Sequence, residues 1–448
     1  MTLIAPPCPS AARRRLAHVI FMSVPFAPSS ATGRLGGHVG TVGAGMVLTG
    51  LGTYVFLAVA GQRMTTSDFA AFSAGWSVLL TAGAGLFIPL EIETSRRLIA
   101  RRGSADPVAW ATRLGVGLTL AVTAATGLAW QPLMHLLDGD ELAVAALPLL
   151  CAANSALMPL RGRAAAAGRF GAYASSLVIE AAVRCAVAGA VLIGGHGSPG
   201  VVLLALPIAA LLAAAVVRGS AASGVADSTR RLGNDTVTRP HRPSDVAGLI
   251  IGSVLAQALL NLPPVLIKAL DGAGDLAGPV LAGLSLARIP LFLSPALIAP
   301  LLPRLAGLHE RGDHGRVAQV AGTVLAIVAL AALASSALAL PLGRPVTGLV
   351  FGRDLALSGG QVAILVLGAM AFLTGQFSSS VLVAVQQHGW VGFGWAAGLA
   401  VFGATWAVVD DPVLGAEWGL VTGAAAAASV FVGALILTRP SDAPAYRR

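Results

Sequence analysis

Several basic side chains of this sequence lie within long apolar stretches or at their edges, namely Arg184, Lys268 and Arg288. An ionisable group inside a bilayer is costly unless it faces a partner or a wet cavity. The planar arginine guanidinium forms paired hydrogen bonds to phosphate oxygens, and a lysine ammonium adds a point charge. We therefore predict a cationic cavity in which these side chains contact a phosphate-bearing substrate.

Glu180 is the intramembrane carboxylate that could serve such a cavity. It stands in the sequence Glu-Ala-Ala-Val-Arg, so that Glu180 and Arg184 share one helical face at i,i+4. One hypothesis is a self-neutralising ion pair. The other is that Arg184 contacts the substrate, while Glu180 is its partner or carries a coupling proton.

Prolines near Arg288 and Lys268 predict irregular backbone at both positions. Pro290 and Pro295 follow Arg288, and Pro263 and Pro264 precede Lys268. A proline frees the carbonyl four residues before it and bends the helix, so we predict helix breaks at these four prolines. Arg288 is either a substrate contact or an arginine satisfied by neighbouring carbonyls. Gln257 and Asn261 share a face ahead of Pro263, and we expect them to form hydrogen bonds between helices.

A second charged group lies where an apolar stretch ends, in Glu91, Glu93, Arg96 and Arg97. Its spacing favours a salt-bridge cluster at the membrane interface. The alternative is a cytoplasmic gate that opens and closes as the protein changes conformation.

The sequence lacks the motifs of the common soluble chemistries. The P-loop pattern is absent and the only lysine is Lys268, and neither HExxH, GxSxG nor a Rossmann fingerprint occurs. The cysteines Cys8, Cys151 and Cys185 have no disulfide or zinc spacing. Asp410 and Asp411 imitate a catalytic pair but are expected in a solvated loop. We therefore predict that the protein is not an enzyme and has no metal site and no cofactor. A proton or sodium gradient could be the energy source, and the sequence does not choose between the two.

The composition identifies the elements that must position these residues. Of 448 residues, 56% are hydrophobic and 11% charged, and the mean hydropathy is +0.81. A membrane helix needs about 20 apolar residues, so this length predicts an all-α polytopic membrane protein of about twelve spans. The apolar runs place them at 38–61, 68–92, 108–130, 141–160, 172–194, 199–217, 246–268, 278–302, 317–342, 357–386, 388–409 and 418–438.

The arginines predict the orientation of these spans, because short basic loops stay in the cytoplasm. They gather at residues 13–15, 96–102, 161–169, 218–242, 304–316 and 439–448, while the alternate loops are acidic and include Glu417. We therefore predict a cell-membrane protein with both termini in the cytoplasm. The net charge of +9 is then explained by the arginines of the cytoplasmic loops, which set the orientation of the spans. No nucleic-acid partner is expected.

The two halves of the sequence resemble each other. The stretch from Asp68 through Phe87 and Pro89 to Arg96 has a counterpart from Asp275 through Phe292 and Pro295 to Arg304. Such repeats are typical of transporters. We predict six-helix bundles at 38–217 and 246–438, related by a pseudo-two-fold along the membrane normal. Residues 1–37 would be a disordered overhang, 218–245 a linker and 439–448 a tail, all cytoplasmic.

Four stretches resemble a known family. They are Leu86-Phe-Ile-Pro-Leu-Glu-Ile-Glu-Thr-Ser-Arg-Arg-Leu98, Leu160-Arg-Gly-Arg with Gly168-Arg-Phe170, Leu286-Ala-Arg-Ile-Pro-Leu-Phe292 with Pro300-Leu-Leu-Pro-Arg304, and Val350-Phe-Gly-Arg-Asp354. Together they are similar to the polysaccharide exporters, or lipid-linked oligosaccharide flippases, of the multidrug/oligosaccharidyl-lipid/polysaccharide (MOP) exporter superfamily, in their actinobacterial form. The resemblance extends over roughly residues 38–438.

The resemblance implies a V-shaped cavity between two bundles and a flippase that moves a polyprenyl-pyrophosphate-linked oligosaccharide for cell-surface polysaccharide biosynthesis. Cavity arginines would hold the pyrophosphate, and of our candidates only Arg288 lies in a matched motif. The expected partners are the lipid-linked glycan, membrane lipids and other polysaccharide-assembly proteins. Two alternatives stay open: a multidrug or metabolite exporter of the same fold, and a non-transporting scaffold of a glycan-assembly complex.

Overall fold

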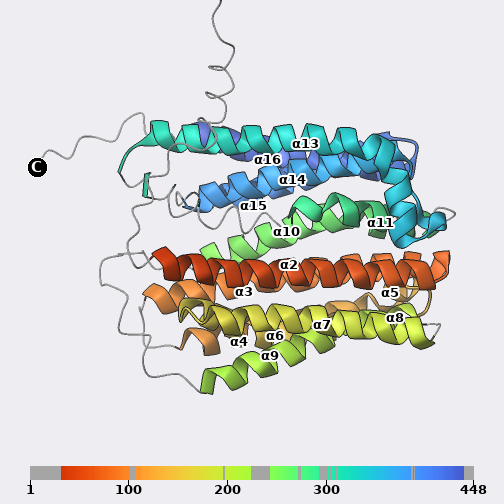
Figure 1. The fold of residues 1–448 in the computed structure, drawn as a ribbon, viewed down its shortest axis with the longest axis horizontal. Helices are drawn as coiled ribbons and strands as arrows, with labels where there is room; N and C mark the ends of the chain where they lie inside the picture. The colour runs from red at the N-terminus through yellow and green to blue at the C-terminus, as the bar shows by residue number, and fades with distance from the viewer. Residues whose placement is uncertain are drawn as a thin grey trace, which may run out of the picture. The chain divides into compact units, whose positions relative to one another are not determined.

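The computed structural model describes residues 32–100, 106–194, 197–222, 243–270, 274–291, 301, 305, 307–308, 311–384, 387 and 389–437, and its long elements are α-helices (Figure 1). The chain divides into two compact units, Met1–Gly40 and Thr41–Arg448, and the second unit holds every site discussed below. Most of the predicted overhang and linker, and the predicted tail, lie outside the described residues.

The first half of the chain forms what we call the N-terminal bundle. Its helices are α2 (Thr32–Arg63), α3 (Thr66–Ala100), α4 (Pro107–Leu128), α5 (Trp130–Leu136), α6 (Glu141–Ala166), α7 (Phe170–Gly194), α8 (Pro199–Leu203) and α9 (Ala205–Ala222). Aspartates begin two of them, because a carboxylate can accept the unpaired amide hydrogens of a first turn. Asp106 accepts from the amide of Val108, and Asp140 accepts from that of Ala143.

The second half forms what we call the C-terminal bundle. Its elements are α10 (Pro243–Lys268), η1 (Gly274–Leu276), α11 (Ala277–Ala287), α13 (His314–Phe351), η2 (Arg353–Leu355), α14 (Gly359–Ala384), α15 (Gly389–Val408) and α16 (Pro412–Leu437). Glycines let α15 and α16 approach closely. A Cβ atom added at Gly398 would lie 2.7 Å from the carbonyl oxygen of Gly423.

Among the described residues, 11 helices are long and apolar enough to cross a membrane, and α11 is a shorter apolar helix at the start of the span predicted over 278–302. The helices agree with the predicted spans in order and position, but several extend further. α3, α6 and α13 continue beyond the predicted ends at 92, 160 and 342, and α16 begins before the predicted start at 418. Hydropathy detects the apolar part of a helix and not the polar turns that continue it.

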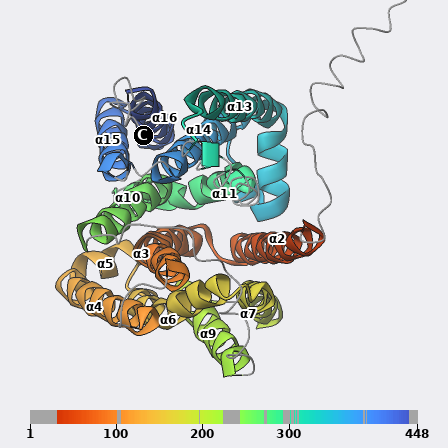
Figure 2. The same ribbon diagram turned by 90° about the vertical axis from the view of Figure 1, so that its left-hand side faces the viewer.

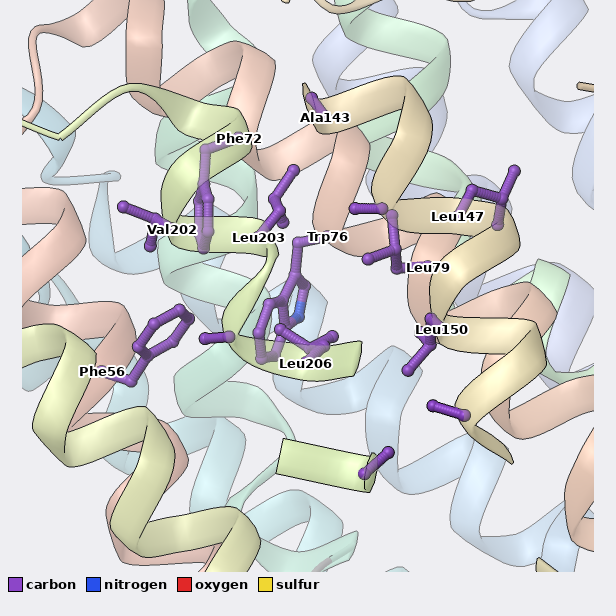
Figure 3. Close-up of a cluster of buried hydrophobic side chains, with 14 of the residues drawn as sticks. Phe56, Phe72, Trp76, Leu79, Ala143, Leu147, Leu150, Val202, Leu203 and Leu206 are labelled. Carbon is purple, nitrogen blue, oxygen red and sulfur yellow. The ribbon is translucent and has the colours of Figure 1, made fainter. Parts of the chain in front are cut away.

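The core of the N-terminal bundle is built on α3 and α6. Aromatic side chains pack at one end, with the ring centroids of Phe56 and Trp76 5.7 Å apart and those of Phe72 and Trp76 5.9 Å apart (Figure 3). Leucines of α6, Leu203 of α8 and Leu206 of α9 belong to the same cluster. A matching cluster lies in the C-terminal bundle, where the Trp395 ring contacts those of Phe372 and Phe431 at 5.0 and 5.2 Å.

The two bundles meet chiefly through α3 and α10, as the view in Figure 2 shows. The contact is tight, because a Cβ atom added at Gly85 on α3 would lie 2.9 Å from the Cα atom of Val254 on α10. α11 also packs against α3. Polar residues of α2, α10 and α11 therefore lie close to the interface between the two bundles. The sequence predicts the substrate cavity at this interface.

Candidate functional site

Arg288 lies where α11 ends and is 8% exposed. Its guanidinium donates a hydrogen bond from Nη2 to the carbonyl oxygen of Leu260 on α10. That carbonyl has no helical partner, because the residue four positions later is Pro264, which has no amide hydrogen. The Nε atom of Arg288 is buried and has no hydrogen-bond partner among the described residues. A neighbouring carbonyl therefore binds the Nη2 atom of Arg288, as one of the two alternatives expected. The Nε atom is not bound in this way by the described residues.

The predicted helix breaks differ from one proline to the next. α10 runs through Pro263 and Pro264 without interruption, so the prediction of a break there is wrong. The two prolines lack the amide hydrogens that a helix would use, but α10 stays helical. The Arg288 guanidinium donates to the Leu260 carbonyl in place of the missing amide of Pro264. α11 ends at Ala287, shortly before Pro290, whereas Pro295 lies outside the described residues.

Among the described residues, the side-chain hydrogen bonds of Asn261 and Gln257 lie within α10, whereas the prediction placed them between helices. The Asn261 Nδ2 atom donates to the Gln257 carbonyl at 2.8 Å and to Gln257 Oε1 at 3.2 Å. Asn261 is 1% exposed, and its Oδ1 atom has no hydrogen-bond partner among the described residues. Next to the Leu260 carbonyl that holds Arg288, α10 thus contains a buried acceptor with unused capacity.

α2 connects the two candidate arginines through adjacent residues. Arg184 Nη1 on α7 donates to Thr53 Oγ1 at 3.0 Å. The Tyr54 hydroxyl donates to the carbonyl oxygen of Ser285 on α11 at 2.6 Å, about one turn before Arg288. Thr53 therefore faces the N-terminal bundle, and Tyr54 faces the C-terminal bundle. α2 thus contacts Arg184 directly through Thr53, and it contacts the last turn of α11, which precedes Arg288, through Tyr54.

Glu180 is paired more closely with an arginine that the sequence did not single out. The Arg161 Nη2 atom lies 3.3 Å from Glu180 Oε2, whereas the Arg184 Nη2 atom lies 4.0 Å from it. Arg161 also donates from Nε to Ser176 Oγ at 2.8 Å. The predicted ion pair of Glu180 and Arg184 therefore includes a third residue, Arg161. Arg184 Nε is left without a hydrogen-bond partner in the described part of the chain.

Arg161 was expected in a cytoplasmic loop, and the structure places it inside α6 at 5% exposure. The next residue, Gly162, allows α6 to cross α3 closely. A Cβ atom at Gly162 would lie 2.4 Å from the carbonyl oxygen of Glu91. The predicted span ended at residue 160, because the hydropathy falls at the Arg-Gly-Arg sequence that follows. This sequence lies inside the helix and could have indicated a close crossing.

The predicted cluster at the end of α3 separates into two groups. Glu93 accepts from Arg96 at 2.8 Å and from Arg97 at 2.7 Å, all within α3, and the Arg97 guanidinium lies 3.6 Å from the centroid of the Trp110 ring on α4. Glu91 accepts from the Tyr173 hydroxyl at 2.8 Å. These described contacts tie α3 to its own bundle, and the gating role of the cluster stays a prediction.

Lys268 is engaged in an ion pair between the bundles. Its Nζ atom lies 2.8 Å from Asp138 Oδ2, in the turn between α5 and α6, and the Lys268 side chain is 8% exposed. The ammonium is therefore neutralised by a partner that the sequence did not predict. The structure groups Arg184 and Arg288 around α2 and places Lys268 in this separate contact.

The Lys268–Asp138 pair belongs to a closed end of the bundle interface, which we define by Gln62, Asp138, Lys268 and Val350. Gln62 Nε2 on α2 donates to the Val350 carbonyl of α13 at 2.8 Å. Nearer its start, α2 carries exposed apolar side chains at Val47, Leu48 and Leu51. The described polar contacts of α2 with the C-terminal bundle are thus concentrated toward one end of the helix.

Glu417 is a further residue that the sequence misplaced. It was expected in an acidic loop, but α16 begins at Pro412, and Glu417 lies in the second turn at 0% exposure. Neither carboxyl oxygen has a hydrogen-bond partner among the described residues. A buried carboxyl without partners is unusual enough to be a functional candidate.

The described residues contain no group of three or more His, Cys, Asp or Glu side chains that could hold a metal ion. Arg184 and Arg288 each retain a buried donor nitrogen without a partner among the described residues. The buried carboxyls of the described residues are Glu93, Glu180 and Glu417. Arginines pair with the first two, and Glu417 has no hydrogen-bond partner there.

Comparisons with known proteins identify the fold. No protein-family model matches the sequence, and no curated protein does. A multidrug resistance MATE family transporter of the MOP superfamily in an inward-facing conformation has a TM-score of 0.63 at 14% identity, over 89% of this chain and 96% of that one. An outward-facing MATE structure of the same description gives 0.58 at 14% identity, over 90% and 96%.

A third similar structure is a MOP superfamily transporter from Pyrococcus furiosus, with a TM-score of 0.61 at 12% identity over 90% of this chain and 96% of that one. It is described as having a binding pocket of reverse polarity that suggests a different function. The fold of this chain is therefore the all-helical membrane fold of the MOP superfamily transporters. The predicted fold class is confirmed, and the predicted superfamily is supported at the level of the fold.

Proposed function

We propose that this protein is a secondary transporter that moves a polyprenyl-pyrophosphate-linked oligosaccharide, or a related polysaccharide precursor, across the cytoplasmic membrane by alternating access. The observation that carries the proposal is Arg288, a buried arginine at the end of α11. It is bonded to α10 at the bundle interface and has a donor nitrogen without a partner among the described residues. The fold supports transport, because relatives of that fold are transporters.

The placement of the arginines favours an anionic substrate. Arg184 contacts Thr53 of α2, and the next residue, Tyr54, contacts Ser285 in the last turn before Arg288. Two guanidinium groups with unused donors suit a pyrophosphate, whose oxygens accept paired hydrogen bonds. In this respect the chain parallels the Pyrococcus furiosus transporter, for which a pocket of reverse polarity is described. Lys268 is not needed for this role, because Asp138 neutralises it.

The interface supports an inward-facing state. The closed end lies beside the loop between α2 and α3 and the turn before α6, which the arginine pattern assigns to the outside. Contacts of α2 with α11 and α13 hold that end together. The higher TM-score with the inward-facing MATE structure agrees with this assignment. The lipid-linked substrate would enter from the cytoplasmic leaflet.

The second candidate is a multidrug or metabolite exporter, which the MATE relatives favour. A cavity for cationic drugs needs an unpaired carboxylate beside the substrate, and Glu180, the carboxyl nearest to Arg184 in the sequence of α7, is instead held by Arg161. The two candidates differ in the charge of the substrate.

A reconstituted translocation assay separates the two. Purified protein in liposomes is given a fluorescent polyprenyl-pyrophosphate saccharide, the matching neutral lipid, or a cationic dye. Faster translocation of the pyrophosphate lipid, reduced about tenfold or more by Arg288→Ala and unchanged by Arg344→Ala, supports the flippase. Arg344 is the matched control because it is exposed on α13. Transport of the dye alone would favour the exporter.

A further inference from the structure

We infer that Glu417 is a proton-binding site of the C-terminal bundle, and that its bound proton stabilises the closed end of the bundle interface. A proton carried there would be the coupling ion of the transport proposed above, so the site rests on the proposed function.

The first observation is the isolation of the carboxyl. Glu417 is 0% exposed, and neither oxygen has a hydrogen-bond partner among the described residues. An ionised carboxylate in a low-dielectric interior needs a cation or several donors. With neither available, the neutral carboxylic acid is the stable form, so the side chain binds a proton in this conformation.

The second observation is the lack of free cations on the packed helices. α16 packs against α10, α14 and α15. Neither α14 nor α15 contains an ionisable residue, and the basic group of α10 is Lys268, which is bonded to Asp138. Arg288, which follows α11, donates to the Leu260 carbonyl. The charged group nearest in sequence is Asp411, whose Oδ1 accepts from the amides of Val413 and Leu414.

The third observation connects Glu417 to the interface. The preceding residue, Ala416, is fully buried in a hydrophobic cluster that α16 shares with Ile267 of α10 and with Ala277 and Val280 of α11. The cluster also contains Ala70 of α3, from the opposite bundle. Separation of the bundles at the closed end therefore removes part of the apolar shell beside Glu417 and admits water.

Proton binding and closure are consequently linked. The conformation that holds the proton more tightly is favoured when protons are abundant, and the hydrated conformation is favoured when they are scarce. The buried state is the closed one, so protonation stabilises closure and deprotonation stabilises opening. Glu180 differs, because Arg161 keeps its carboxylate paired inside one bundle.

The first test reads the protonation state directly and needs no substrate. Infrared spectra of the full-length protein in lipid are recorded at neutral pH for the wild type, Glu417→Gln and Asp411→Asn. Asn keeps a side-chain oxygen for the cap of α16. Loss of a carboxylic-acid carbonyl band in Glu417→Gln but not in Asp411→Asn supports the inference. Loss of carboxylate bands instead would overturn it.

The second test reads the link to closure. Spin labels are placed at Arg63 on α2 and Leu349 on α13, which are exposed near the closed end, in a chain with Cys8, Cys151 and Cys185 replaced. We expect the long-distance population of the wild type to rise severalfold as the pH is raised. Glu417→Gln should keep the short distance at every pH. The same pH dependence in Glu417→Gln would overturn the inference.

These outcomes separate the site from the substrate. If both tests succeed and the pyrophosphate lipid is not translocated, the proton site stands and the flippase assignment fails. If the lipid is translocated and Glu417→Gln changes neither spectrum nor distance, the flippase stands and the proton site fails.

Discussion

Arg288 donates a hydrogen bond to the carbonyl oxygen of Leu260, the group that Pro264 leaves without its helical partner. The Arg288 side chain thus supplies the hydrogen bond that Pro264 removes from α10. It also places a guanidinium at the bundle interface. The Nε atom of Arg288 has no hydrogen-bond partner in the described part of the chain. The structural role of Arg288 and its proposed binding role can be separated by mutation.

The Leu260 carbonyl provides the first prediction. Arg288→Ala leaves it buried and unbonded, at a cost of about 1–3 kcal/mol, and the thermal unfolding midpoint in detergent should fall. Pro264→Ala restores an amide hydrogen at the required position. The double variant should therefore recover most of the lost stability but none of the substrate translocation. A double variant as unstable as Arg288→Ala would show that the hydrogen bond does not hold α10.

The Lys268–Asp138 ion pair provides the second prediction. Asp138 is 44% exposed on its side chain, so the pair contributes about 1 kcal/mol or less. Lys268→Met should increase the population that is open at this end by a few-fold, measured with the Arg63 and Leu349 spin labels. Exchanging the charges, Lys268→Asp with Asp138→Lys, should restore the wild-type distribution. An unchanged distribution in Lys268→Met would exclude the pair as part of the closure.

The Arg161–Glu180 pair provides the third prediction. Arg161→Ala leaves Glu180 buried with Arg184 as a distant partner, and breaking a buried pair in this way costs about 3–5 kcal/mol. Arg184→Ala should cost less, because its distance to Glu180 is 4.0 Å and that of Arg161 is 3.3 Å. Thermal unfolding of the purified variants measures both. Arg316→Ala, which removes an exposed pair with Asp313, is the control and should change little.

The crossing of α3 and α6 provides the fourth prediction. Gly162→Ala places a Cβ atom 2.4 Å from the Glu91 carbonyl oxygen, and the overpacking should cost about 1–3 kcal/mol. Gly189→Ala on α7 meets nothing within 4 Å and is the matched control. It should be neutral or slightly stabilising, because alanine favours the helix. Equal unfolding midpoints for the two variants would contradict the close crossing.

The sequence predicted the spans because apolar length is a local property. It failed where polar turns extend a helix, and Arg161 and Glu417 were assigned to loops for that reason. Glu180 and Arg184 were predicted as partners because their spacing is local. The Arg161–Glu180 and Lys268–Asp138 pairs depend on how separate helices approach, which no local pattern contains. The pseudo-two-fold and the cytoplasmic termini remain predictions.

The central claim is that Arg288 serves the translocation of a lipid-linked anionic glycan, and the leaflet in which that precursor accumulates tests it most directly. Cells depleted of this protein are rescued with the wild type, Arg288→Lys, the Arg288→Ala/Pro264→Ala double variant or Arg344→Ala. We expect the precursor to be trapped in the inner leaflet with the double variant, partly released with Arg288→Lys, and absent from that leaflet with the wild type and Arg344→Ala. Unchanged sidedness on depletion, or full rescue by the stable double variant, would contradict the account.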